Sequence, residues 1–167
     1  DICPSRTLFV SHSDGSHLLV SMERSHRDGG KPGFPKWNGI VLQQYEVQEN
    51  RLVGECRKIY AGSRLGTTEG PHLYEIDGWF YLLTAEGGTF YNHGVTLARS
   101  RDLFGPYETD PVGQMMTSRY DCRLPLQRVG HADLIENSLG EWFIVHLCGR
   151  PLPSKGRSPM GRETAIQ

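Results

Sequence analysis

The sequence has few cysteines, and their spacing excludes several classes of protein. The chain has 167 residues and four cysteines, none of them in a C-x-x-C pair, which argues against a zinc site. An even count permits two disulfides, but this density is low for a secreted scaffold. The N-terminus also lacks the basic-then-apolar order of a signal peptide. We therefore expect reduced, mostly buried thiols in a cytoplasmic protein.

Excess charge and long apolar runs are also missing. The formal net charge is −1, so there is no electrostatic reason to expect nucleic acid or an anionic membrane as a partner. No apolar run approaches the roughly 18 residues that a membrane span needs. Long helical periodicities are few, whereas the chain contains 20 glycines and 10 prolines. This balance predicts an all-β protein rich in turns, and no linker divides residues 1–167.

Short strand patterns recur along the chain. The strongest hairpin signal is Asp77-Gly78, which lies between two runs of apolar β-formers. Three polar or irregular stretches, residues 24–37, 109–129 and 148–161, are interpreted as long loops, which commonly form sites in a compact β fold. Strands are expected at residues 18–22, 39–46, 51–54, 71–76, 79–85, 94–100, 132–136 and 141–147, with another beginning at 164–167.

Two of the expected hairpins share one pattern. Residues 71–85 and 131–147 each place a residue capable of chemistry just before or at the start of the first strand, and each has an aromatic-rich second strand. The sequence separation of Glu69 and His131 falls in the period range of propellers and solenoids. Repeated four-stranded units with apolar inner strands favour propeller blades, although two weak copies do not prove a repeat.

Four sites at strand starts or strand breaks could carry chemistry. Glu69 precedes the first hairpin, where a carboxyl group can be aimed; the alternative is a surface residue in a turn. Residues 83–89 break into Gly-Gly, which lets a backbone approach a ligand closely or makes an ordinary turn. His131 follows a glycine that leaves space around it, or is a structural histidine. Arg162 could offer a fork of donors to hydroxyl oxygens, or form a surface ion pair. Together they suit a neutral, polyhydroxylated ligand.

Five long motifs resemble those of glycoside hydrolase family 43, and in particular its β-xylosidase branch. They are T-E-G-P-H-L-Y at residues 68–74, Y-L-L-T-A-E-G-G-T at 81–89, P-L-Q-R-V-G-H at 125–131, H-L-C-G-R-P-L at 146–152 and G-R-E-T-A-I-Q at 161–167. The resemblance runs from about residue 18 to residue 167. It implies the family's five-bladed β-propeller fold. It also implies an inverting glycosidase that acts on xylo-oligosaccharides, arabinosyl side chains or both.

The resemblance also assigns roles to individual residues. Glu69 occupies the position of the general acid, and Thr89 that of a threonine near the bound sugar. His131 matches a histidine beneath the pocket, and Arg162 an arginine that contacts the sugar cleaved from the chain end. No cofactor is required. In some relatives the channel histidine helps to hold a calcium or other ion through water, which implies an ion near His131.

Two departures from the family pattern concern the other acidic groups. Inverting hydrolysis needs a second carboxylate as general base, which the family supplies from a blade before the start of this chain. If Pro4-Ser5 sets the register, Cys3 replaces the Asp that tunes the acid, with extra residues before Leu8-Phe9. A thiol gives no like-charge repulsion, so we expect Glu69 to be mostly carboxylate at neutral pH.

The resemblance therefore implies slightly under three blades of five. Residues 1–167 would be a partial catalytic propeller that lacks the N-terminal blades and the C-terminal closure. We expect an exo-β-xylosidase-like hydrolase represented by its acid-bearing part. The alternative is a non-catalytic carbohydrate-binding pseudoenzyme or an inactive fragment. The expected partner is a xylo-oligosaccharide or arabinoside, with self-association or missing blades from another chain. A preference between xylose and arabinose stays open.

Overall fold

The structure, a computed structural model, is all β in the part of the chain that it describes. It describes residues 2–12, 14–24, 37–152 and 156–167, and gives the backbone alone for residues 2–11, 24, 37 and 38. Within these ranges, eleven strands form three antiparallel sheets. The strands are β1 (Ile2–Ser11), β2 (His17–Arg24), β3 (Trp37–Glu46), β4 (Arg51–Tyr60), β5 (Glu69–Ile76), β6 (Trp79–Glu86), β7 (Gly94–Ser100), β8 (Glu108–Thr117), β9 (Gln127–Glu136), β10 (Trp142–Gly149) and β11 (Glu163–Ile166).

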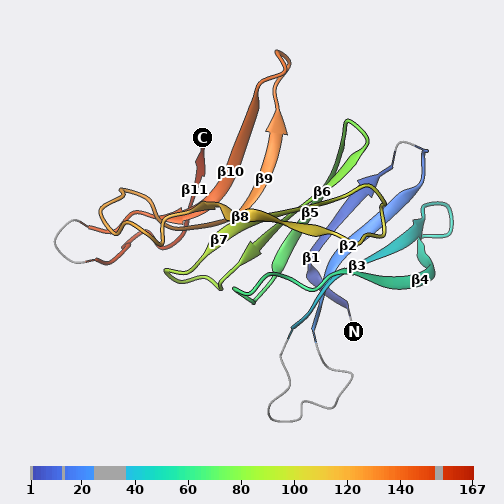
Figure 1. Cartoon of the computed structure of the whole chain (residues 1–167), viewed down its shortest axis with the longest axis horizontal. Coiled ribbons are helices and arrows are strands. Elements are labelled where there is room, and N and C mark those ends of the chain that lie inside the picture. Colours follow the sequence, from blue (N-terminus) through green and yellow to red (C-terminus); the bar gives the residue numbers. More distant parts are fainter. Residues whose placement is uncertain (1, 13, 25–36, 153–155) are drawn as a thin grey trace, which may run out of the picture.

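The three sheets follow one another along the chain, as the blades of a propeller do. The first sheet has the order β1-β2-β3-β4, the second β5-β6-β7-β8 and the third β11-β10-β9. Figure 1 shows them fanned out, from the blue and teal N-terminal sheet to the orange and red C-terminal sheet. Each sheet is a meander, and the third has one strand fewer than a four-stranded blade. The expected all-β propeller fold, with slightly under three blades, is confirmed.

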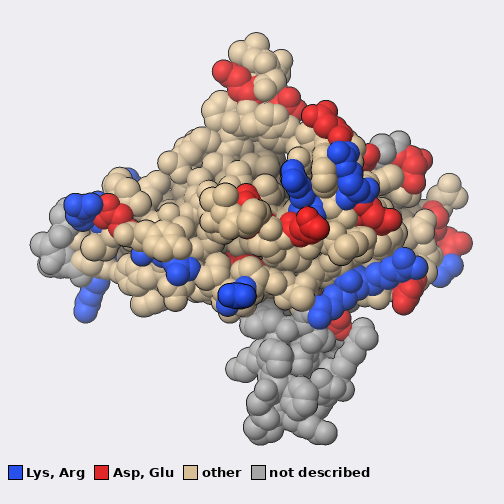
Figure 2. Space-filling model, viewed as in Figure 1, with Lys and Arg blue, Asp and Glu red and all other residues tan. Residues whose placement is uncertain are grey.

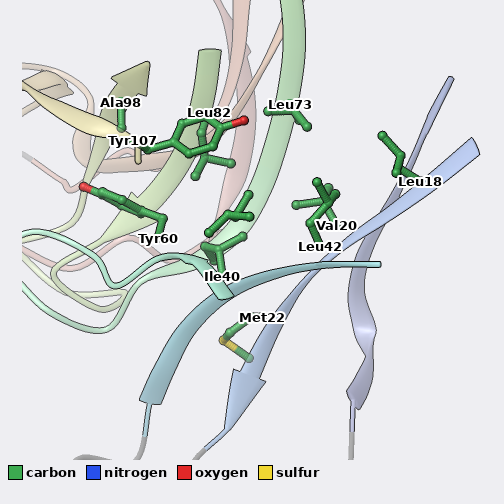
Figure 3. Packing of buried hydrophobic residues seen from close by; sticks show 11 residues of the cluster. Leu18, Val20, Met22, Ile40, Leu42, Tyr60, Leu73, Leu82, Ala98 and Tyr107 are labelled. Atoms are coloured by element: carbon green, nitrogen blue, oxygen red, sulfur yellow. The ribbon is translucent and has the colours of Figure 1, made fainter. Parts of the chain in front are cut away.

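Two apolar layers join the sheets face to face. The first layer lies between the first and second sheets, with Ile40 and Leu42 of the first sheet on one side and Leu82 of the second on the other (Figure 3). The second layer contains Leu83 and Ile144 and lies between the second and third sheets. Consecutive side chains of a strand point to opposite faces, so neighbouring residues of β6 enter different layers. This explains why β6 is apolar in an almost continuous run.

The hairpin predicted at Asp77-Gly78 is present. Both residues have positive φ, 51° and 70°, as a two-residue type I′ turn requires. Ile76 pairs with Trp79 directly across this turn. The turn fixes the register of β5 and β6 as far as His72, and a register shift between His72 and Glu69 then sets the pairing of Glu69.

Some sequence expectations were wrong. Residues 109–129 were interpreted as a loop, but residues 109–117 belong to β8 and residues 127–129 to β9. β8 is the outermost strand of its sheet and largely exposed, so its side chains do not alternate, and Pro111 is tolerated there. β1 was not expected either. The expected loop at 24–37 falls mostly on residues 25–36, outside the described residues.

The cysteines differ from expectation as well. Cys56, Cys122 and Cys148 are free thiols, but of these three Cys148 alone is buried and Cys122 is exposed. No helix able to cross a membrane occurs among the residues that the structure describes.

Candidate functional site

Glu69 is the first residue of β5 and its side chain is buried, at 4% exposure. It pairs with Ala85 of β6. The backbone turns sharply on both sides of it, because Thr67 has a φ of 54° and Gly70 one of 55°. A left-handed φ is unfavourable for a β-branched residue such as Thr67, and it persists only where the surroundings impose it. Glu69 is therefore held by a constrained segment rather than by a relaxed turn.

Glu86, at the end of β6, supplies part of that constraint. It is 0% exposed, and both oxygens of its carboxylate accept hydrogen bonds. Oε1 accepts from the backbone N–H of Ser63 at 2.8 Å and from the hydroxyl of Thr68 at 2.7 Å. Oε2 accepts from the hydroxyl of Thr96 at 3.0 Å and from that of Ser63. These bonds connect the second sheet to the segment that leads into Glu69.

His131 lies directly against the residue that follows Glu69. A Cβ on Gly70 would come within 2.8 Å of Cε1 and Nε2 of the His131 ring. His131 also has a positive φ, 53°, at its position in β9. The sequence prediction placed Glu69 and His131 in one site, and the structure brings their segments into contact.

A second histidine, His93, packs beneath the start of β9. Its ring lies against Gly130, its Nδ1 is 3.1 Å from the carbonyl oxygen of Arg128, and its Nε2 has no partner among the described residues. Burial lowers the pKa of His93, the hydrogen bond to Arg128 opposes this, and the positive charge of Arg162 lowers it further. His93 is therefore a neutral histidine packed against Gly130 beneath the candidate site.

A polar cluster ties β5 to β9 beside these residues. Asp133 Oδ1 accepts a hydrogen bond from the hydroxyl of Tyr74 at 2.6 Å and lies 3.1 Å from Nδ1 of His72. The Tyr74 oxygen in turn accepts from the backbone N–H of Leu134 at 2.9 Å. Burial lowers the pKa of His72, and the Asp133 carboxylate opposes this. The cluster fixes the spacing of the two strands that carry Glu69 and His131.

Thr89 and Arg162 lie on the more open side of this region. Thr89 is exposed in the turn between β6 and β7, and Arg162 is exposed one residue before β11. The positive charge of Arg162 lowers the pKa of His93, so Arg162 lies near this histidine. The adjacent Glu163 pairs with Arg150, whose Nε lies 2.9 Å from Oε2.

An open depression of about 270 Å³ lies beside β9 and β10. Its lining includes His72, His131, His146 and Thr164. Glu69 is not among the described residues that line it. A single pocket shared by Glu69, His131 and Arg162 stays a prediction.

The two remaining sequence expectations concern an ion and Cys3. Among the described residues, no group of three or more His, Cys, Asp or Glu side chains could hold a metal ion. A directly ligated metal does not fit here, and a water-held ion near His131 stays a prediction. Cys3 lies in β1, but its side chain is outside the described part of the structure. The backbone of β1 does bulge there, since Ile2 pairs with Glu23 and Thr7 with Ser21. This agrees with the extra residues expected before Leu8.

Two carboxylates of the site were not singled out from the sequence. Glu86 ends an apolar strand, and a Glu directly after such a run is a candidate for burial with partners. Asp133 stands two residues after His131 on one strand, so both point to the same face. At the Gly-Gly break, a Cβ on Gly87 would come 2.1 Å from the carbonyl oxygen of Asn92, which favours the ordinary turn of the two interpretations. That glycine closes a turn instead of making room for a ligand.

The sequence and fold were compared with those of known proteins. Xylosidase/arabinosidase 43B of Humicola insolens is 46% identical over 154 residues, which cover 92% of this chain and 28% of the relative. A β-xylosidase of Bacillus subtilis strain 168 is 42% identical over 163 residues, which cover 93% and 30%. The crystal structure of a xylan β-1,4-xylosidase from Bacillus halodurans C-125 superposes with a TM-score of 0.90 at 47% identity, covering 97% of this chain and 30% of that one.

The chain thus spans less than a third of the length of these relatives. The family model described as glycosyl hydrolases family 43 matches residues 7–167, nearly the whole chain. The family predicted from the five motifs is therefore confirmed, and the chain belongs to glycosyl hydrolases family 43.

Proposed function

We propose that this chain carries the acid-bearing part of an inverting glycoside hydrolase. Glu69 protonates the glycosidic oxygen as the bond to the leaving sugar breaks. A water on the opposite face of the ring is activated by a second carboxylate. The observation that carries the proposal is a buried carboxyl group, at 4% exposure, held between two left-handed backbone positions. A general acid must be fixed within hydrogen-bond reach of the atom that it protonates.

The proposed substrates are xylo-oligosaccharides or arabinosyl side chains of xylan, attacked from the chain end. The relatives, which include a β-xylosidase and a xylosidase/arabinosidase, support this class. The surface agrees with an uncharged ligand. Figure 2 shows Lys, Arg, Asp and Glu side chains interspersed on the viewed face, and the formal net charge is −1.

A second candidate function is sugar binding without turnover. The observation that favours it is Cys3, which stands where the resemblance expects an acid-tuning Asp if Pro4-Ser5 sets the register. Under this alternative the site would retain its hydrogen-bonding residues, and Glu69 would act as an acceptor.

Turnover and equilibrium binding, measured on the same preparation, separate the two functions. Hydrolysis of phenyl β-xyloside, whose leaving group is a poor one, and calorimetric binding of xylobiose should both depend on Glu69. The resemblance assigns the general base to a residue outside this chain, so we expect turnover to be lower by roughly 10²–10⁴-fold than with the base in place. Slow hydrolysis that disappears in Glu69→Gln supports the hydrolase. Binding without any hydrolysis supports the alternative, and neither binding nor hydrolysis overturns both.

A further inference from the structure

Glu86 is a fully buried carboxylate that accepts a hydrogen bond from Thr68, the residue directly before the candidate acid. We propose that Glu86 is a positioning residue for Glu69. It holds the backbone on which Glu69 is mounted, through the hydroxyl of Thr68, and so sets the direction of the acid carboxyl. The role of Glu69 as acid rests on the proposed function, whereas the hold on its backbone does not.

The bonding of Glu86 connects three separate segments. Its carboxylate receives hydrogen bonds from Ser63 and Thr68 before β5 and from Thr96 of β7. Glu86 itself ends β6. Thr68, Glu86 and Thr96 are each at most 2% exposed, so water does not compete for these bonds. The carboxylate therefore acts as a fixed point between the sheet and the segment that precedes the acid.

The segment held in this way would not keep its shape unaided. Thr67, next to Thr68, has a left-handed φ of 54°, which a β-branched residue avoids when it is free to relax. A second bond supports the same segment, since the N–H of Gly87 donates to the carbonyl oxygen of Gly66 at 2.9 Å. Glu86 and its successor Gly87 thus clamp residues 66–68 at two points.

Gly62 packs directly against the Thr68 hydroxyl. A Cβ on Gly62 would lie 2.0 Å from Thr68 Oγ1 and 3.2 Å from Glu86 Oε1. Gly62 has a φ of 90°, so a larger residue is excluded there by conformation as well as by space. Glycine at this position keeps open the path of the Thr68–Glu86 bond.

Thr68→Val tests the proposal with the least disturbance. It is nearly isosteric and removes one hydroxyl donor to Glu86. Thr96→Val is the matched control, because it removes one hydroxyl donor from the same carboxylate but lies on β7. Thr68→Ser restores the hydroxyl. Glu86→Ala would remove four bonds at once and threaten folding, whereas Glu86→Gln can keep all four, since hydroxyls also accept hydrogen bonds.

Nuclear magnetic resonance of the full 167-residue chain gives the primary readout. We expect Thr68→Val to speed hydrogen exchange at the amides of Glu69 and Gly70 by about tenfold or more, the effect of losing one charge-assisted hydrogen bond. It should also move the carboxyl carbon resonance of Glu69. Thr96→Val should leave both signals at their wild-type values, and Thr68→Ser and Glu86→Gln should remain close to wild type.

A general loss of stability would affect Thr68→Val and Thr96→Val alike. Equal effects of these two variants on Glu69, or no effect of either, would overturn the positioning role. The contrast between them does not depend on turnover. If the contrast is found and no hydrolysis of any xyloside is detected, the positioning role stands and the proposed function fails.

A kinetic readout adds to this where turnover is measurable. A misplacement of about 1 Å can cost roughly 10²-fold in rate. Thr68→Val should therefore lower kcat by about 10- to 100-fold and leave KM within about twofold. A change in KM with unaltered kcat would contradict an effect that acts through the acid.

Discussion

Gly130 has a packing role that its neighbours in sequence do not reveal. The sequence suggests that it makes room for His131, yet the ring lying against it is that of His93, and His131 lies against Gly70. The histidine position could be predicted from the motif. The glycine that packs against the His131 ring could not be predicted, because this contact depends on how β9 packs against segments distant in the chain.

Gly130→Ala should therefore destabilise the fold. The new Cβ would come 2.6 Å from the ring of His93, which is 1% exposed and has little room to move. Overpacking of this kind typically costs about 1–3 kcal/mol. The measurement is the free energy of unfolding in urea. Gly149→Ala is the control, because its Cβ would meet the movable hydroxyl of Ser158. Equal losses in both variants would contradict this packing.

Two buried histidines make stability depend on pH. Burial lowers the pKa values of His72 and His93 below their ordinary 6.5 in the folded chain. The unfolded chain then binds more protons as the pH falls below 6.5, so the folded state loses stability from there down to the folded-state pKa values. Urea unfolding should show lower stability at about pH 5.5 than at about pH 7.5, and a smaller difference in His93→Gln. Equal or higher stability at the acidic pH would refute this.

At the scale of elements, β6 is covered on both faces. Leu82 and Leu83 are both 0% exposed, one in each apolar layer. Leu82→Ala and Leu83→Ala should each lower the free energy of unfolding by about 2–5 kcal/mol. Val112→Ala on β8, where the side chain is 90% exposed, should change it by less than about 0.5 kcal/mol. A small loss for either leucine would show that its layer is not packed as described.

The same contrast explains which strands the sequence could predict. β6 and β10 have strong apolar patterns because sheets pack on them, and both were expected close to their observed positions. β8 is an exposed outer strand with Pro111 and Gly113 inside it, so it has the composition of a loop. An outer strand forms because its backbone pairs with a neighbouring strand. Backbone pairing requires few apolar side chains, so the composition of a single outer strand does not reveal it.

At the scale of the whole molecule, the third sheet presents a partly exposed apolar face. Ile135 pairs with Phe143 and Val145 with Ile166, so these four side chains share the face opposite Ile144. Ile135 is 43% exposed and Ile166 59%. Apolar patches of this kind promote association.

We therefore expect the 167-residue chain to self-associate through this face. Sedimentation equilibrium should give an average mass that rises with protein concentration. Ile166→Lys should reduce the association, because it places a charge in the patch. Val112→Lys, on the exposed outer strand of another sheet, should not. A monomer at all concentrations, or equal effects of both substitutions, would contradict this expectation.

The family and the fold could be predicted because long ordered motifs carry both. The network around the acid could not, because Thr68, Glu86 and Asp133 reach partners on other strands. Each of these residues lies within or next to a motif that the sequence displays. The sequence does not show how far apart these motifs lie in space, because the packing of the sheets determines that distance.

The most direct test of the central claim compares leaving groups. This chain would replace the matching segment of the Bacillus halodurans xylosidase, to which it is 47% identical, so that the remaining blades are supplied. A general acid matters most when the leaving group is a poor one. Glu69→Gln should lower kcat/KM for xylobiose by roughly 10²–10⁴-fold and for dinitrophenyl β-xyloside by less than about tenfold. Equal losses on the two substrates would show that Glu69 is not the proton donor.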